Sequence, residues 1–184
     1  MASKRVRIDD NAPAGRRPKA VPPPPLHAML GVKLWNNPCR LSFRVNFIAH
    51  HFNQTAYEWV WRTYRLTLPE HIVLYALALK DGITADDIAA STARPKNTLS
   101  RGVNAVLRKK LIDRRADPKD RRRLILTLTA RGRRIVARTV PAFVAHENGM
   151  ASALTAGERR ALEALLEKII VDKPNWPTQI QGRP

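Results

Sequence analysis

The chain has 184 residues, enough for one domain of ordinary size with its own hydrophobic core and with tails. Its 33 lysines and arginines against 15 aspartates and glutamates give a formal charge of +18, which opposes compaction and therefore indicates a polyanionic partner. Nucleic acid is the first candidate and an acidic membrane surface the second, but no apolar run approaches about 18 residues, so we expect no membrane span.

The N-terminal segment is polar, basic and rich in proline, with an uninterrupted proline tract over residues 22–25. No apolar core follows its first basic residues, so we do not expect a secretory signal. This composition predicts that residues 1–36 form a flexible arm, which is either a solvated tail or a segment that touches DNA phosphates. The single cysteine, Cys39, excludes an internal disulfide, which is typical of a protein of the reducing cytoplasm.

Two helices are predicted after this arm. Ordered structure should begin near Asn37 and Pro38, because asparagine is a good helix cap and proline suits a first helical turn. Residues 39–64 lack glycine and proline, and their apolar residues recur at steps of three and four, which indicates a long amphipathic helix. Pro69 then opens the helix EHIVLYALAL, which ends at the Asp-Gly pair that follows.

Two shorter helices are predicted next, separated by a tight turn. Thr84 caps the first, ADDIAAS, and Pro95 starts the second, PKNTLSRGVNAVLRKKL. The apolar stripe of this second helix consists of Leu99, Val103, Val106 and Leu107. Two helices in this arrangement are a helix-turn-helix candidate.

A β-hairpin follows, with strands predicted over residues 111–116 and 123–128 and the turn sequence DPKDRR between them. Three leucines on one face of the second strand are expected to anchor the hairpin to the core: Leu124, Leu126 and Leu128. The order of helix-turn-helix and then hairpin predicts a winged helix.

The last third is predicted to be helical. Thr129 caps a helix that contains Pro141, where we expect a kink or a break. A capping box over residues 155–158 precedes the amphipathic helix RRALEALLEKII, and residues 173–184 are predicted to form an irregular tail.

The segment from Thr84 to Ile135 resembles the MarR family of bacterial transcription regulators. Its most specific part is DPKDRR followed by LTLTARG, which is similar to the wing sequence of that family, and weaker agreement extends over residues 38–170. The resemblance implies a mainly α fold with a small β-hairpin wing, a winged helix-turn-helix, in an intertwined helical homodimer. One departure is Lys110, where the family usually has glycine just before the hairpin.

This resemblance also implies a division of the chain. Residues 67–129 would form the winged helix-turn-helix DNA-binding domain, and residues 37–66 and 130–172 the helical dimerisation region. The dimer interface would include an apolar stripe on the last helix: Leu162, Leu165, Leu166 and Ile169.

Polar side chains on the second short helix are of the kinds that hydrogen-bond base edges. The resemblance implies that this helix lies in the major groove of double-stranded DNA. The candidate residues there are Lys96, Asn97, Thr98, Ser100, Arg101 and Asn104. At the hairpin tip, Arg121 or Arg122 is implied to enter the minor groove. Asp117 or Asp120 would orient these arginines through salt bridges.

Regulators of this family usually release DNA when a small molecule binds between the dimer helices and the winged helix. The first long helix places arginine, phenylalanine and histidine on roughly one face, which suits a carboxylate on an aromatic ring. The sequence therefore predicts a small aromatic acid as ligand. The first long helix is similar to that of family members that repress the catabolism of nicotinate or other aromatic acids, and this resemblance implies a hydroxynicotinate-type acid. The candidate residues are Arg40, Phe43, Asn46, Phe47, His50 and His51, with walls from Trp59, Tyr64, His71 and Tyr75. The alternative is that the phenylalanines belong to the core.

Two other functions stay open from the sequence. Cys39 lies at the predicted helix start, where the helix dipole lowers a thiol pKa, so a redox-sensing repressor is one alternative. A sequence-neutral architectural DNA binder fits the charge equally well. Enzyme motifs such as a Gly-rich phosphate loop, HExxH or a nucleophile elbow do not occur, so we expect neither an enzyme nor a cofactor. No metal is expected, because consecutive His50 and His51 point about 100° apart on a helix.

Overall fold

The computed structural model describes residues 26–92, 94–118 and 120–180, so most of the predicted arm lies outside the described residues. The chain divides into two compact units, Met1–Asn46 and Phe47–Pro184. Within the described ranges no helix is both long and apolar enough to cross a membrane. The same ranges hold no group of three or more potential metal ligands.

The first unit contains a helix, α1 (Ala28–Trp35), that the sequence analysis did not predict. The prediction of a flexible arm is therefore wrong for these residues. The Trp35 ring packs over Gly31, since a Cβ at Gly31 would come within 2.9 Å of that ring. The guanidinium of Arg44 donates to the carbonyl of Leu34 at 2.5 Å, which satisfies one of the carbonyls left free at the end of the helix.

The long helix α2 (Arg40–Tyr64) confirms the amphipathic helix predicted over residues 39–64. It begins in the first unit and continues into the second. Its buried residues, Ala56 and Val60, lie one turn apart and belong to the core of the second unit.

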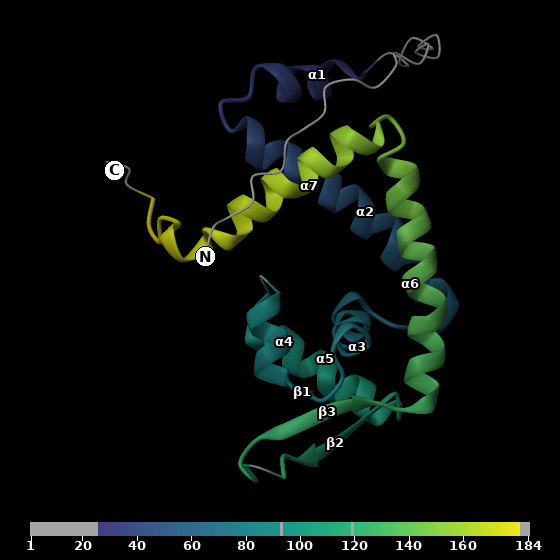
Figure 1. Cartoon of the computed structure of the whole chain (residues 1–184). Coiled ribbons are helices and arrows are strands. Elements are labelled where there is room, and N and C mark those ends of the chain that lie inside the picture. The colour runs from purple at the N-terminus through teal and green to yellow at the C-terminus, as the bar shows by residue number, and fades with distance from the viewer. Residues whose placement is uncertain (1–25, 93, 119, 181–184) are drawn as a thin grey trace, which may run out of the picture. The chain divides into compact units, whose positions relative to one another are not determined.

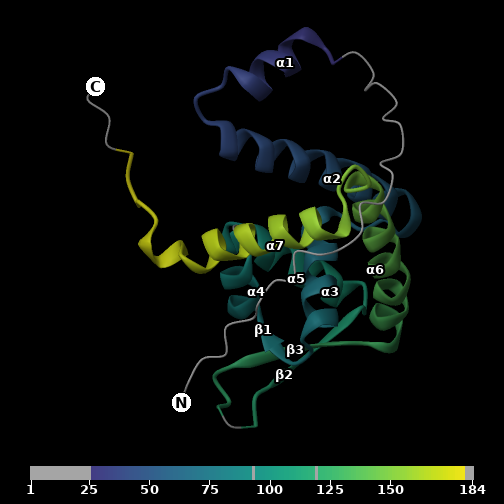
Figure 2. The same cartoon turned by 45° about the horizontal axis from the view of Figure 1, so that its top comes forward.

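The second unit contains most of α2, the helix-turn-helix, the wing and three further helices (Figures 1 and 2). After α2 come α3 (Leu68–Leu79), β1 (Ile83–Thr84), α4 (Ala85–Ser91), α5 (Lys96–Arg108), β2 (Ile112–Ala116), β3 (Leu124–Leu128), α6 (Ala130–Met150), α7 (Ala156–Val171) and the 3-10 turn Lys173–Asn175. This mainly helical architecture with a hairpin wing confirms the predicted fold class.

The three strands form one antiparallel sheet in the order β1-β3-β2. Leu126 lies at its centre, paired with Ile83 on one side and with Arg114 on the other. The hairpin β2–β3 was predicted, but β1 was not, because its two residues are too short to show the alternation that marks a strand.

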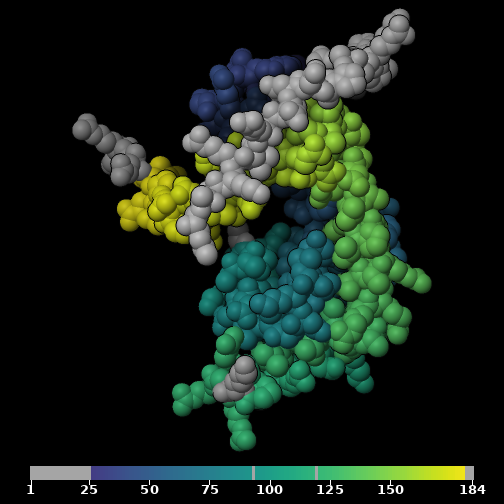
Figure 3. Space-filling view, in the orientation of Figure 1, coloured from purple at the N-terminus to yellow at the C-terminus, as the bar shows by residue number. Residues whose placement is uncertain are grey.

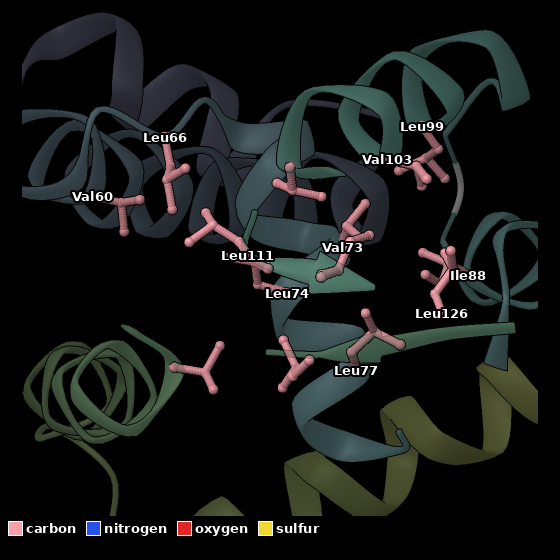
Figure 4. Packing of buried hydrophobic residues seen from close by; sticks show 14 of the residues in the cluster. Val60, Leu66, Val73, Leu74, Leu77, Ile88, Leu99, Val103, Leu111 and Leu126 are labelled. Carbon is pink, nitrogen blue, oxygen red and sulfur yellow. The ribbon is translucent and has the colours of Figure 1, made fainter. Parts of the chain in front are cut away.

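One hydrophobic core joins α3, α5 and the sheet (Figure 4). The predicted stripe of α5 faces it, with Leu99, Val103 and Val106 buried and Leu107 half-buried. Leu126 and Leu128 anchor the wing as predicted. The prediction is wrong for Leu124, which is 47% exposed because it stands at the tip end of its strand, beyond the helices.

The end of α5 shows how the chain accommodates lysine where the family usually has glycine. Lys110 takes a φ of 55°, in the left-handed region. Its N–H donates to Leu107 O, and the N–H of Leu111 donates to Val106 O. This pair of bonds is the Schellman arrangement that ends many helices and that usually employs glycine at the left-handed position.

We expect Lys110→Gly to raise the free energy of unfolding by about 1 kcal/mol, because a side chain other than glycine is strained in the left-handed region. Lys80→Gly is the matched control. Lys80 also follows a helix, but its φ is −150°, outside the left-handed region, so glycine there relieves no backbone strain. Urea unfolding of both variants measures the difference, and equal changes in the two would contradict the explanation.

Pro141 does not break α6, which continues from Ala130 to Met150 with the proline inside it. The expected break is therefore wrong, and the alternative, a kink at Pro141, stays a prediction. The neighbouring turns hold the helix on the core, since Val136, Thr139 and Phe143 are all buried. This packing offsets the hydrogen bond that a proline removes from a helix.

Candidate nucleic-acid interface

Helix α5 is divided into a buried face and a polar face. Leu99 and Val103 turn into the core, whereas the predicted base-contacting residues lie on the outside of the helix. Exposed residues of that set are Lys96, Asn97, Ser100, Arg101 and Asn104, and Thr98 is half-buried. A helix anchored on one side and polar on the other has the form of a major-groove reader.

Two acidic residues of α4 lie close to basic residues of this surface. Lys96 Nζ is 3.0 Å from Asp86 Oδ1, and both side chains are about four-fifths exposed. A pair this exposed contributes little, at most about 1 kcal/mol, so Lys96 is free to exchange it for a phosphate or a base. Asp87 caps α4 through Thr84, whose backbone hydrogen bond holds the pKa of that carboxyl below its ordinary value.

The wing tip is a hydrogen-bonded turn that carries exposed arginines. The N–H of Asp117 donates to Arg123 O at 2.8 Å, and the N–H of Arg123 donates to Asp120 O at 2.9 Å. A carboxylate oxygen of Asp120 accepts the backbone N–H of Arg122 at 3.0 Å. In the space-filling view this tip extends away from the rest of its domain (Figure 3). Asp120 thus fixes the backbone from which Arg122 projects.

The ten predicted ligand residues are divided between the two units. Arg40, Phe43 and Asn46 belong to the first unit, and the other seven belong to the second. Along α2, the rings of Phe47 and His51 lie 4.4 Å apart. Further along the same helix, Trp59 and Tyr64 make an edge contact with ring centroids 5.9 Å apart.

His71 lies in the core of the second unit. It is fully buried, and its Nε2 makes a 2.9 Å hydrogen bond with Thr139 Oγ1 of α6. The rings of Tyr57, Tyr75 and Phe143 surround it. Burial lowers the pKa of His71 to about 4, so the ring is neutral at physiological pH.

A cavity of about 500 Å³ opens beside this cluster and contains one of the predicted residues, His50. Its lining residues are His50, Asn53, Gln54, Tyr57, Leu68 and Arg94. Burial raises the pKa of Tyr57 to about 12, although the positive charge of Arg94 acts in the opposite direction. Arg94 stands directly before Pro95, the cap residue of α5.

Arg94 was not predicted as a candidate ligand residue. It comes from the turn between α4 and α5 and approaches α2 only in the folded chain. The arginine next to the helix-opening proline was visible in the sequence, but nothing there placed it opposite Tyr57.

Tyr64 lines a different cavity of about 580 Å³, together with residues of α6. Its other lining residues are Thr63, Arg131, Arg134, Ile135, Ala137 and Arg138.

Cys39 is exposed and stands just before α2, with its N–H donating to Asn37 Oδ1 at 2.9 Å. The proposed redox role of this thiol stays a prediction.

Helix α7 presents the apolar stripe that was predicted for a dimer interface. Leu162, Leu165 and Ile169 are 43%, 62% and 38% exposed, and Leu166 is half-buried. Contiguous apolar exposure of this kind is unusual on a monomeric protein and marks an interaction surface.

Comparisons with known proteins agree with this arrangement. The sequence model of the MarR family matches residues 66–123, from the turn between α2 and α3 to the wing tip. The transcriptional regulator HosA of Escherichia coli O111:H- is 28% identical over 119 residues, which are 65% of this chain and 88% of that protein. An HTH-type transcriptional repressor of Mycobacterium tuberculosis is 33% identical over 108 residues, which are 56% of this chain and 75% of the repressor.

Solved structures show the same similarity. A MarR-family regulator from Silicibacter pomeroyi is similar in fold with a TM-score of 0.66 and 23% identity, over 82% of this chain and 97% of that one. The Staphylococcus aureus MepR–DNA complex has a TM-score of 0.62 and 30% identity, over 72% of this chain and 97% of MepR. The helix-turn-helix, the basic wing and these relatives together show that the chain belongs to the MarR family of winged-helix transcriptional regulators.

Proposed function

We propose that this chain is a transcriptional repressor that binds a pseudo-palindromic operator in double-stranded DNA as a homodimer. The observation that carries the proposal is the polar outer face of α5 beside a basic wing tip, on a chain with a net charge of +18. MepR, which is 30% identical and covered over almost its whole length, was solved in complex with DNA. A two-fold dimer would present two copies of α5 to successive major grooves.

The polar face of α5 is proposed to read bases, and the wing to reach the flanking minor groove. Arg101 suits a guanine edge, Asn97 and Asn104 suit adenine, and Ser100 suits a base or a phosphate. Asp120 holds the backbone of Arg122, so this arginine is the better placed of the two to enter the groove.

We expect Arg122→Ala to weaken operator binding about tenfold to a hundredfold, because one arginine contact in a groove contributes about 1–3 kcal/mol. Dimerisation should be unchanged. The matched control is Arg160→Ala, which removes another exposed arginine, on α7. Fluorescence anisotropy with labelled operator measures both variants, and an equal loss in the two would contradict a specific role for the wing.

The apolar stripe of α7 is proposed to be part of the homodimer interface. We expect Leu165→Asp to convert the dimer to monomers, since it places a charge at the most exposed position of the predicted stripe. Leu79→Asp is the control, because Leu79 is an exposed leucine at the end of α3, outside the stripe. Light scattering after gel filtration gives the masses, and a dimeric Leu165→Asp variant would contradict this interface.

The proposed ligand is a small aromatic acid in the cavity that contains His50 and Arg94. The guanidinium of Arg94 suits a carboxylate, and the amides of Asn53 and Gln54 suit a ring substituent. Because Arg94 directly precedes α5, a ligand held there would favour a placement of the recognition helix that no longer matches the DNA. The ligand can act in this way only by binding the released state more tightly.

This part of the proposal is tested by thermal shift with 6-hydroxynicotinate and with benzoate. Wild type and Arg40→Ala, which retains the cavity, should be stabilised, whereas Arg94→Gln should not respond. Ligand affinity measured with and without operator should differ, and equal affinities would remove the release mechanism. A loss of DNA binding on oxidation, with no response to either acid, would instead favour the Cys39 alternative.

A further inference from the structure

Lys109 directly follows α5, and its side chain reaches across to the start of α3. Its Nζ lies 2.7 Å from Glu70 Oε1 and donates to the carbonyl of Arg65 at 2.9 Å. We name residues 65–70 the α2–α3 corner; they comprise the link after α2 and the first three residues of α3. Lys109 therefore binds this corner at two points, one on its backbone and one on a side chain.

The partner of Lys109 is a buried carboxylate. The Glu70 side chain is only 6% exposed, whereas the Lys109 side chain is 40% exposed. The other carboxylate oxygen of Glu70 accepts from the backbone N–H of Thr67 at 2.7 Å and from its hydroxyl at 3.1 Å. Burial alone would raise the pKa of Glu70, but the hydrogen bonds from Lys109 and Thr67 outweigh it and hold the pKa below its ordinary value.

This arrangement makes Lys109 costly to move. A buried carboxylate that loses its only cationic partner among the described residues is strongly destabilised. An interaction with a DNA phosphate would require Lys109 to leave Glu70. The neighbouring basic residues Arg108 and Lys110 carry no such bridge within the described part of the chain.

The corner also contacts α5 further back along the helix. A Cβ at Gly102 would come within 2.9 Å of Pro69 O, so the helix and the corner are in close backbone contact there. Arg65 and Lys110, which flank the bridge, both take left-handed conformations, with φ values of 54° and 55°. Gly102 and Lys109 thus hold α5 on the corner at two positions two turns apart.

We propose that Lys109 is a positioning residue for DNA recognition, which holds α5 in register on the α2–α3 corner and does not contact phosphate. The inference rests on the proposed DNA binding. It divides the basic cluster at the end of α5 into one residue that orients the helix and others that remain available to the DNA backbone. A displaced α5 would lose base contacts while the nonspecific attraction to phosphates persists.

The test compares Lys109→Met and Glu70→Gln with Arg108→Met in the full-length chain. Affinity is measured by anisotropy for the operator and for a scrambled duplex of equal length, over a series of salt concentrations. For Lys109→Met we expect about a tenfold loss for the operator, which corresponds to 1.4 kcal/mol, with unchanged affinity for the scrambled duplex and an unchanged salt slope. Arg108→Met should weaken both duplexes alike and reduce the salt slope by about one.

For Glu70→Gln, the positioning role and a phosphate contact by Lys109 predict opposite changes in operator affinity. It removes a negative charge and releases Lys109, so a phosphate-contacting Lys109 would bind DNA more tightly in this variant. The positioning role predicts weaker operator binding and an unchanged scrambled-duplex affinity. Lys109→Arg, which can still reach Glu70, should restore most of the preference for operator.

The inference is overturned if Lys109→Met loses about one unit of salt slope, as Arg108→Met does, or if Glu70→Gln binds operator more tightly. Should Lys109→Met fail to fold, Glu70→Gln and Lys109→Arg decide the question by the same two readouts. If wild type shows no preference for any operator over the scrambled duplex, the proposed function fails and this inference fails with it.

Discussion

Gly132→Ala is expected to lower the free energy of unfolding by about 3 kcal/mol, because alanine does not fit at the junction of the wing and α6. A Cβ at Gly132 would overlap the carbonyl oxygen of Leu111 and come within 3.1 Å of the Leu128 side chain. That carbonyl is not free to move away, since it accepts hydrogen bonds from both the N–H and the hydroxyl of Thr129. The clash is therefore with fixed backbone.

Gly149→Ala is the matched control for this prediction. Gly149 lies in the same helix, and nothing stands within 4 Å of a Cβ placed there. Alanine should stabilise the helix at this position by up to about 1 kcal/mol. Urea unfolding of both variants gives the two changes in free energy, and a stable Gly132→Ala variant would show that the junction tolerates movement.

Acidification is expected to destabilise the fold through His71. The pKa of this buried ring is about 4 in the folded chain, against 6.5 for an ordinary histidine. The unfolded chain therefore takes up a proton as the pH falls below 6.5, whereas the folded chain does so only near pH 4. Between pH 6.5 and pH 4 the free energy of unfolding therefore falls by about 3 kcal/mol. Above pH 6.5 the free energy of unfolding does not depend on the titration of His71.

His71→Gln tests this assignment, since glutamine faces Thr139 with a hydrogen-bonding group that does not titrate. The difference in unfolding free energy between wild type and variant should narrow as the pH falls from 6.5 to 4. His51→Gln, at an exposed position on α2, should retain the wild-type profile. If the His71→Gln variant loses stability with acid as steeply as wild type, other groups cause the loss.

Much of the fold was predictable because its elements carry strong local signals. The apolar steps of α2 and α5 each bury one face, and the turn sequence between the wing strands fixes the hairpin. The exposed face of α5, which is proposed to contact DNA, followed from the same periodicity, since a buried Leu99 and Val103 place Asn97 and Arg101 outside.

Other features depend on contacts between distant residues and were not predictable. Helix α1 is short and lies in a proline-rich context, and its end is capped by Arg44, which is ten residues beyond Leu34. Continuity of α6 through Pro141 depends on burial of the neighbouring turns. Arg94 and Tyr57 are brought together only by tertiary folding, so no face of a single helix contained the cavity.

This chain is proposed to recognise a specific two-fold DNA sequence through α5 and the wing. DNase I footprinting of the wild-type chain on genomic fragments tests it most directly. The proposal predicts a protected pseudo-palindrome whose half-site centres lie about 10 base pairs apart, because two recognition helices of a dimer enter successive major grooves. Uniform protection with no preferred site, at salt concentrations where binding persists, would contradict it and favour a sequence-neutral architectural role.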